Sequence, residues 1–121
     1  KSAADLLQYA QMSGRFAPVA ELWETALAQG ALLSGPAAEL FAAWADADLA
    51  GLQTDAALAH FSRANQLNPA SWPLAEKLAR LNLDLKDFAR AGQVLRGFLS
   101  GSPSAVDRQK AEALLARTHQ P

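Results

Sequence analysis

Apolar residues recur along the chain at the three- and four-residue spacing of an amphipathic helix, and turn-forming residues close each run. The first run ends near Ser13 and Gly14. The second begins at Phe16 and should end near Gly30, because glycine adopts the left-handed conformation that terminates a helix. The residues expected to mark these two helices are Leu6, Leu7, Ala10 and Gln11, then Phe16, Val19, Ala20, Trp23, Ala26 and Leu27. The pattern predicts a helix pair.

A second helix pair follows a short linker. Its first helix begins with a proline, which the first turn of a helix tolerates. Thr54 or Asp55 can cap the second helix, which is expected to run from Ala56 to about Leu67. The apolar face of the first helix is expected to consist of Leu40, Phe41, Trp44 and Ala47. The sequence leaves open which of two registers, one residue apart, places this face toward the neighbouring helices.

Two helix N-cap residues mark the start of each helix in a third pair. Ser71 can cap its first helix and Asp87 its second. A turn-forming segment, 100–104, then precedes a last amphipathic run. The apolar positions expected are Leu74, Leu78, Leu81 and Leu85, then Phe88, Ala91, Val94, Leu95 and Phe98, and finally Val106, Ala113, Leu114 and Leu115. The chain should therefore hold about seven helices, three pairs and one left over.

Composition strengthens this prediction. The chain has 28 alanines and 20 leucines but no isoleucine and only three valines. Alanine and leucine lose little conformational freedom in a helix, whereas the β-branched residues that favour sheets are nearly missing. An all-α fold follows. The absence of cysteine excludes disulfides, thiolate metal sites and cysteine nucleophiles.

The second and third pairs repeat with a fixed period. Pro69 and Pro103 are 34 residues apart, and counting back from them places Ala57 opposite Ala91 and Phe61 opposite Leu95. A helix-pair period of 34 is typical of tetratricopeptide repeats. The strongest local match is A-x3-F-x2-A-x4-P, formed by Ala57, Phe61, Ala64 and Pro69. The chain thus resembles that family over about 100 residues, by degenerate motifs.

The resemblance implies an α-solenoid of antiparallel helix pairs wound into a right-handed superhelix. It would form one domain over 1–121, with repeats at about 2–34, 36–69 and 70–103 and a capping helix at about 104–118. The outer face of the cap would be charged, through Asp107, Arg108, Lys110, Glu112 and Arg117. The aromatic side chains Trp23, Trp44, Phe61, Phe88 and Phe98 are expected in the core.

Phe98 departs from the family pattern, because it stands where a small residue is usual. The departure predicts looser packing of the third pair against the last helix. An uncapped apolar end could also stack on another copy of the chain. Self-assembly through the ends of the solenoid is therefore the alternative function considered.

Candidate chemistry is sparse. His60 has no acidic residue one helical turn away, so it is expected on the surface, and His119 lies in the tail. The segment 46–51 begins like a calcium loop, but Ala50 and Ala57 stand where two ligands are needed. No nucleophile elbow or phosphate loop is present. The expectation is a protein without catalytic residues, metal or cofactor, and not an enzyme.

Charge is unevenly distributed. Residues 1–62 carry seven acidic and two basic groups, a net charge of −5, whereas residues 63–121 carry nine basic and five acidic groups, a net charge of +4. The predicted first helices are mostly acidic, which disfavours nucleic acid as a partner. The longest apolar runs are too short to span a bilayer. The bias toward alanine and against isoleucine and cysteine suggests a bacterial protein of the cytoplasm or periplasm, and the chain is expected to be a soluble piece of a longer one.

In the tetratricopeptide family the first helices line a groove that binds a partner peptide. The resemblance would place this groove at Asp5, Gln8, Gln11, Met12, Glu39, Ala42, Asp46, Asp48, Glu76, Arg80, Leu83 and Asp84. The groove would be predominantly acidic, so the expected partner is a peptide or protein with basic and apolar residues. The chain would then be a non-catalytic interaction scaffold, part of a bacterial protein of secretion, envelope assembly or biogenesis.

Overall fold

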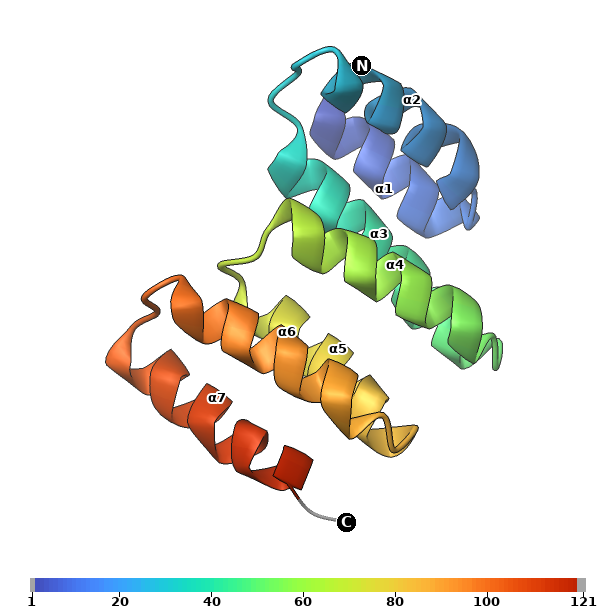
Figure 1. Ribbon diagram of the computed structural model, residues 1–121. Coiled ribbons are helices and arrows are strands. Elements are labelled where there is room, and N and C mark those ends of the chain that lie inside the picture. Colours follow the sequence, from blue (N-terminus) through green and yellow to red (C-terminus); the bar gives the residue numbers. More distant parts are fainter. Residues whose placement is uncertain (1, 120–121) are drawn as a thin grey trace. The chain divides into compact units, whose positions relative to one another are not determined.

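The computed structural model describes residues 2–119, and in this range the chain is all-α, with no strand. The predicted fold class is confirmed. Within each unit, Figure 1 shows successive helices that are joined by short connections and pack side by side. The helices are α1 (Ala3–Ser13), α2 (Phe16–Ala28), α3 (Ser34–Ala50), α4 (Thr54–Leu67), α5 (Trp72–Asp84), α6 (Phe88–Ser100) and α7 (Ala105–Ala116), followed by the 3₁₀ turn η1 (Arg117–His119).

Short polar side chains begin several helices. Ser71 Oγ accepts a hydrogen bond from the backbone N–H of Leu74 at 3.4 Å, and Asp87 Oδ1 accepts one from Arg90 at 3.2 Å. Both predicted caps are therefore confirmed. The cap predicted for α4 is wrong, because Thr54 is already helical and the residue before it, Gln53, makes no side-chain cap bond.

The turns inside the second and third pairs share one backbone geometry. Leu52 and Lys86, the residues in question, both have φ of 61°, in the left-handed region. In each turn a backbone N–H bonds back to the carbonyl five residues earlier, from Gln53 to Asp48 at 2.7 Å and from Asp87 to Asn82 at 2.8 Å. These bonds accompany the end of the first helix of each pair, and the left-handed position of the turn is filled by a residue other than glycine.

The chain divides into two compact units. Unit 1 is Lys1–Asn68 and unit 2 is Pro69–Pro121. The division lies beside Pro69, where the sequence places the end of the second repeat. Each unit is described by itself below, and the superhelical handedness stays a prediction.

Unit 1 is organised around α3. This helix packs against α4 and also against α1 and α2 (Figure 1). The fully buried side chains of largest volume are Phe61 and Leu40, and alanines fill most remaining core positions. Small side chains allow helices to approach closely, so larger ones interlock beside them. The buried set is Ala10, Phe16, Val19, Ala20, Trp23, Ala37, Ala38, Leu40, Phe41, Ala45, Ala57, Phe61 and Ala64.

Unit 2 repeats part of this arrangement. Helix α5 packs against α6, and α7 packs against both, as α3 packs against α1 and α2. The core cluster consists of Trp72, Ala75, Ala79, Leu83, Ala91, Leu95, Phe98, Ala111 and Leu114. The face predicted for α5 is therefore partly wrong. Leu85 is 47% exposed, whereas Ala75 and Ala79 are fully buried.

Phe98 does not loosen unit 2. Its side chain is 4% exposed and belongs to the core cluster together with Ala111 and Leu114 of α7. Ala111 provides space for the ring, because a methyl side chain lets α6 and α7 approach. The expectation of loose packing is wrong, and Phe98 offers no apolar surface through which copies could stack.

Candidate partner-binding faces

The groove residues predicted on α1 lie on its exposed side. Asp5, Gln8 and Gln11 are exposed, and Met12 is 79% exposed. The opposite side of the helix carries the buried Ala10. The exposure of these side chains makes the row available to a partner.

On α3 the predicted residues are also accessible. Glu39 and Asp46 are exposed and Ala42 is half-buried, on the side away from the buried Leu40 and Phe41. Because α1 and α3 pack against each other, the two rows belong to neighbouring helices. The two helices together carry four carboxylates and no lysine, arginine or histidine. The acidic character predicted for the first helices thus holds in unit 1.

Asp48 differs from the other acidic residues of α3. Its Oδ2 atom lies 2.6 Å from Nδ1 of His60 on α4, and the two side chains are 13% and 18% exposed. The imidazole stacks on the indole of Trp44, with ring centroids 3.7 Å apart and planes 20° apart. Expecting His60 on an open surface was therefore wrong, because its acidic partner comes from another helix.

Trp44 links this pair to the rest of unit 1. The ring of Phe16 stacks against it at 5.9 Å between centroids, and Phe41 lies at 6.0 Å. Side chains from α2, α3 and α4 thereby form one aromatic cluster, defined by Phe16, Phe41, Trp44 and His60. The cluster and Asp48 hold helices together, which makes Asp48 a structural residue and weakens its assignment to the groove.

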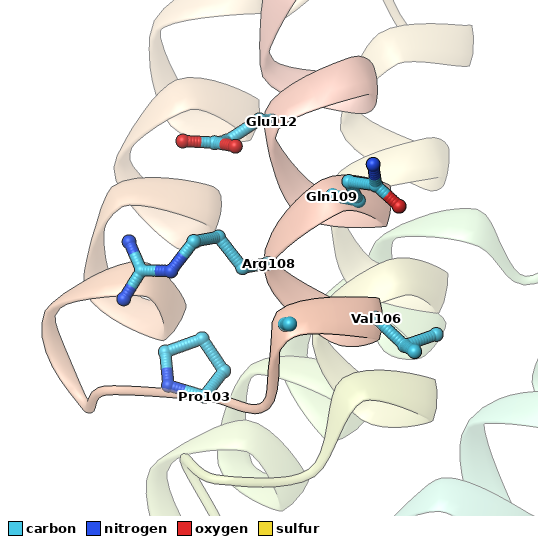
Figure 2. Close-up of a pocket in the computed structure, with 6 residues that line it drawn as sticks. Pro103, Val106, Arg108, Gln109 and Glu112 are labelled. Atoms are coloured by element: carbon cyan, nitrogen blue, oxygen red, sulfur yellow. The ribbon is translucent and has the colours of Figure 1, made fainter.

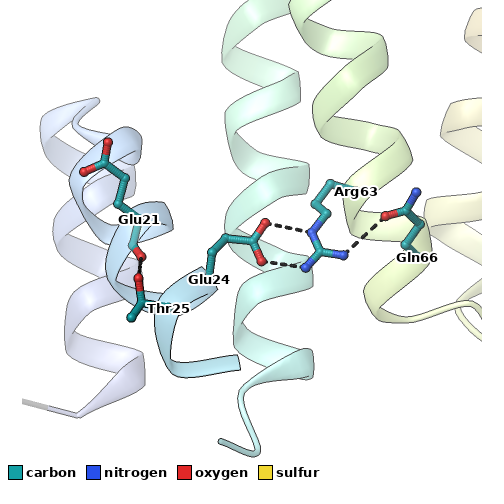
Figure 3. A network of polar contacts seen from close by, with 5 residues as sticks. All are labelled: Glu21, Glu24, Thr25, Arg63 and Gln66. Atoms are coloured by element: carbon teal, nitrogen blue, oxygen red, sulfur yellow. Dashed lines mark hydrogen bonds and ion pairs between the residues drawn. The ribbon is translucent and has the colours of Figure 1, made fainter. Parts of the chain in front are cut away.

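A second ion pair joins α2 to α4. Arg63 donates from Nε to Oε2 of Glu24 at 2.8 Å and from Nη2 to Oε1 at 2.5 Å, and a third donor reaches Gln66 at 3.2 Å (Figure 3). The hydrogen bonds from Arg63 hold the pKa of Glu24 below its usual value, against a smaller opposing effect of burial. The two-pronged geometry fixes the orientation of both side chains.

In unit 2 the predicted residues Glu76, Arg80 and Asp84 line two adjoining pockets between α5 and the C-terminal part of the unit. The larger has a volume of about 380 Å³ and is lined by Trp72, Glu76, Arg80, Lys110, Ala113, Leu114 and Arg117. The smaller has a volume of about 260 Å³ and is lined by Arg80, Leu83, Asp84 and Arg117. The structure thus joins predicted groove residues to residues that the sequence assigned to the cap.

The side chains from the end of the chain change the charge of these pockets. Lys110 and Arg117 were expected on an outer charged face, yet both line the pockets with Arg80. Three basic residues therefore face two acidic ones, Glu76 and Asp84. The expectation of a predominantly acidic groove does not extend to unit 2. Helical spacing puts Lys110 and Arg117, seven residues apart, on one side of the last helix, but it does not show that this side faces α5.

A third pocket surrounds the start of α7. It has a volume of about 550 Å³ and is lined by Pro103, Ala105, Val106, Arg108, Gln109 and Glu112. Figure 2 shows Arg108 and Glu112 pointing to one side of α7 and Val106 and Gln109 to the other. Val106, expected on the apolar face, is 61% exposed. The charged outer face predicted for the last helix is thus present here, in Arg108 and Glu112.

Within residues 2–119 no group of three or more histidine or acidic side chains is placed to hold a metal ion. No helix in the same range combines the length and apolar character needed to cross a bilayer. Searches of protein-family models and of curated proteins find no match to this chain. The faces described above are therefore interpreted from their own chemistry.

Proposed function

We propose that the chain is a non-catalytic protein-interaction module, and that the exposed rows of α1 and α3 bind a basic and apolar segment of a partner protein. The observation that carries the proposal is the charge of these helices, which pack together and, besides the Asp48 that pairs with His60, contain three carboxylates without one basic residue. A lysine- or arginine-bearing segment would gain charge-assisted hydrogen bonds along both helices.

Apolar side chains on the same surface favour a protein partner over a simple cation. Tyr9 is 44% exposed and Met12 79% exposed on α1. Methionine and tyrosine adapt to varied apolar surfaces and are common in interfaces. The packing of antiparallel helices within each unit also supports the resemblance to tetratricopeptide repeats, in which first helices bind peptides.

The test measures binding of a fluorescent, end-blocked peptide of about ten residues in which lysine and leucine alternate, chosen as the simplest basic and apolar segment. Charge reversal in Asp5→Lys and Glu39→Lys should each weaken binding by about three- to tenfold, because each replaces an attractive charge by a repulsive one. Glu21→Lys is the matched control. Glu21 is exposed in the same unit but lies on α2.

The proposal requires that Glu21→Lys leave affinity unchanged within about twofold and that added salt weaken binding to the wild-type protein. Equal losses in all three variants would mean attraction to the net charge of unit 1, with no face involved. Indifference to Asp5→Lys and Glu39→Lys would remove α1 and α3 as the binding surface.

A further inference from the structure

The two pockets of unit 2 bring like charges together. Arg80 and Arg117 line both pockets, and Lys110 lines the larger one. The three residues come from α5, α7 and η1, so the fold, and not a run of basic sequence, gathers them. Cations held close to each other repel unless carboxylates or a bound anion lie between them.

The carboxylates of unit 2 do not fully balance these cations. Glu76 is occupied by Arg80, which donates to its Oε2 from Nη2 at 3.0 Å and from Nε at 3.2 Å. In the part of the chain that the structure describes, Lys110 and Arg117 form no ion pair. Asp84 is then the remaining acidic residue of the pockets. The pockets carry a net positive charge of one, with two cationic donors open to a ligand.

The larger pocket also has an apolar side. Trp72 and Leu114 line it while lying mostly within the core, at 7% and 4% exposure. The indole is held in place by Phe98, whose ring centroid lies 5.3 Å away. A volume of about 380 Å³ accommodates one or two side chains. The pocket therefore suits an apolar side chain placed next to a carboxylate.

We propose that these pockets bind an acidic segment of a partner protein. A glutamate or aspartate side chain of that segment lies between Lys110 and Arg117, and a neighbouring apolar side chain packs on Trp72 and Leu114. This site lies in unit 2 and has the opposite charge preference to the face proposed on α1 and α3, so the two proposals stand or fall separately.

The test uses a fluorescent peptide of about ten residues in which glutamate and leucine alternate, acetylated and amidated so that only side chains carry charge. Its affinity for the full chain is measured by fluorescence anisotropy at low salt. Arg117→Gln and Lys110→Gln should each weaken binding, Arg117→Gln by about tenfold, which corresponds to one charge-assisted hydrogen bond. Circular dichroism of each variant verifies the helical fold.

Arg108→Gln is the matched control, because Arg108 is exposed on α7, the helix of Lys110, but lines the pocket at the start of that helix. It removes the same charge as Arg117→Gln and should leave affinity unchanged within about twofold. Equal losses in both variants would reduce the effect to net charge and overturn the site. Absence of binding to the wild-type protein at millimolar peptide would overturn it as well.

Two further outcomes would assign the pockets to another occupant and overturn the proposal. Binding of a peptide with a free C-terminus but not of the amidated one would mean that the terminal carboxylate is the ligand. Self-association of the wild-type chain in low salt that Arg117→Gln abolishes, measured by sedimentation over a concentration series, would mean that the occupant is a second copy.

Discussion

Units 1 and 2 use different chemistry to hold similar helix pairs together. In unit 1 ion pairs join different helices, Asp48 to His60 and Glu24 to Arg63, and an aromatic cluster links three helices. In unit 2 the ion pairs Glu76–Arg80 and Asp87–Arg90 each join residues within a single turn of chain, and the core is largely alanine and leucine. The named ion pairs connect helices in unit 1, whereas those named in unit 2 stay within a single turn.

Helix pairing constrains the size of the buried side chains and the helix face on which they lie more than it constrains the type of the other residues. Unit 1 contains seven acidic and three basic residues, a net charge of −4, and unit 2 contains five acidic and eight basic residues, a net charge of +3. Surface charge can therefore differ in sign between units built in the same way. Stability should depend on pH and on single polar groups more strongly in unit 1.

The largest effects should come from the two cores and should be similar. Phe61→Ala is expected to lower the free energy of unfolding of unit 1 by about 3–5 kcal/mol, and Leu95→Ala that of unit 2 by about 2–5 kcal/mol, because both side chains are fully buried. Urea unfolding monitored by tryptophan fluorescence measures both, and Trp72→Phe restricts the signal to Trp23 and Trp44 of unit 1. A loss below about 1 kcal/mol in either variant would contradict the core assignment.

Removing one member of an ion pair should lower the free energy of unfolding more in unit 1 than in unit 2. Asp48→Ala leaves the mostly buried imidazole of His60 without its hydrogen bond and is expected to cost about 1–2 kcal/mol. The matched change in unit 2, Glu76→Ala, breaks an exposed pair on one helix and should cost about 0.3–0.5 kcal/mol. Urea unfolding of both variants gives the comparison, and equal losses would remove the distinction drawn between the units.

A similarly small effect concerns the pH dependence contributed by Glu24. Because folding lowers its pKa, its bond to Arg63 contributes stability above the pKa of an unfolded glutamate, and that contribution is lost as pH falls through the folded value. Both side chains are more than a third exposed, so we expect only about 0.2–1 kcal/mol. Comparing the wild-type protein with Glu24→Gln by unfolding from about pH 6 to about pH 3 measures the contribution. Glu21→Gln, on the same helix, should retain the pH dependence that Glu24→Gln loses.

Local signals in the sequence predicted the fold well. Ser71 and Asp87 begin helices as expected, and Gly30 has the left-handed φ, 92°, that its position after α2 predicts. These features depend on a few neighbouring residues, so a single sequence displays them. The second helices were also predicted well, because Ala57, Phe61 and Ala64 form an unambiguous buried stripe.

Contacts between helices were harder to predict. Helix α5 has apolar residues on several sides, so its leucines suggested a face that excludes the buried Ala75 and Ala79. Asp48 and His60 are twelve residues apart, and no spacing rule connects them. Lys110 and Arg117 belong to the unit 2 pockets only because α7 packs on α5. Each of these features depends on how two helices meet, and no pattern within one helix encodes it.

The turns at Leu52 and Lys86 show where the information for a repeat can reside. Both residues take the same left-handed conformation although their side chains have nothing in common, because backbone hydrogen bonds impose it. At such positions the residue type can change while the backbone geometry is retained. Two copies of this turn can then share a backbone structure without sharing residues, and a comparison of sequence alone will score them as unrelated.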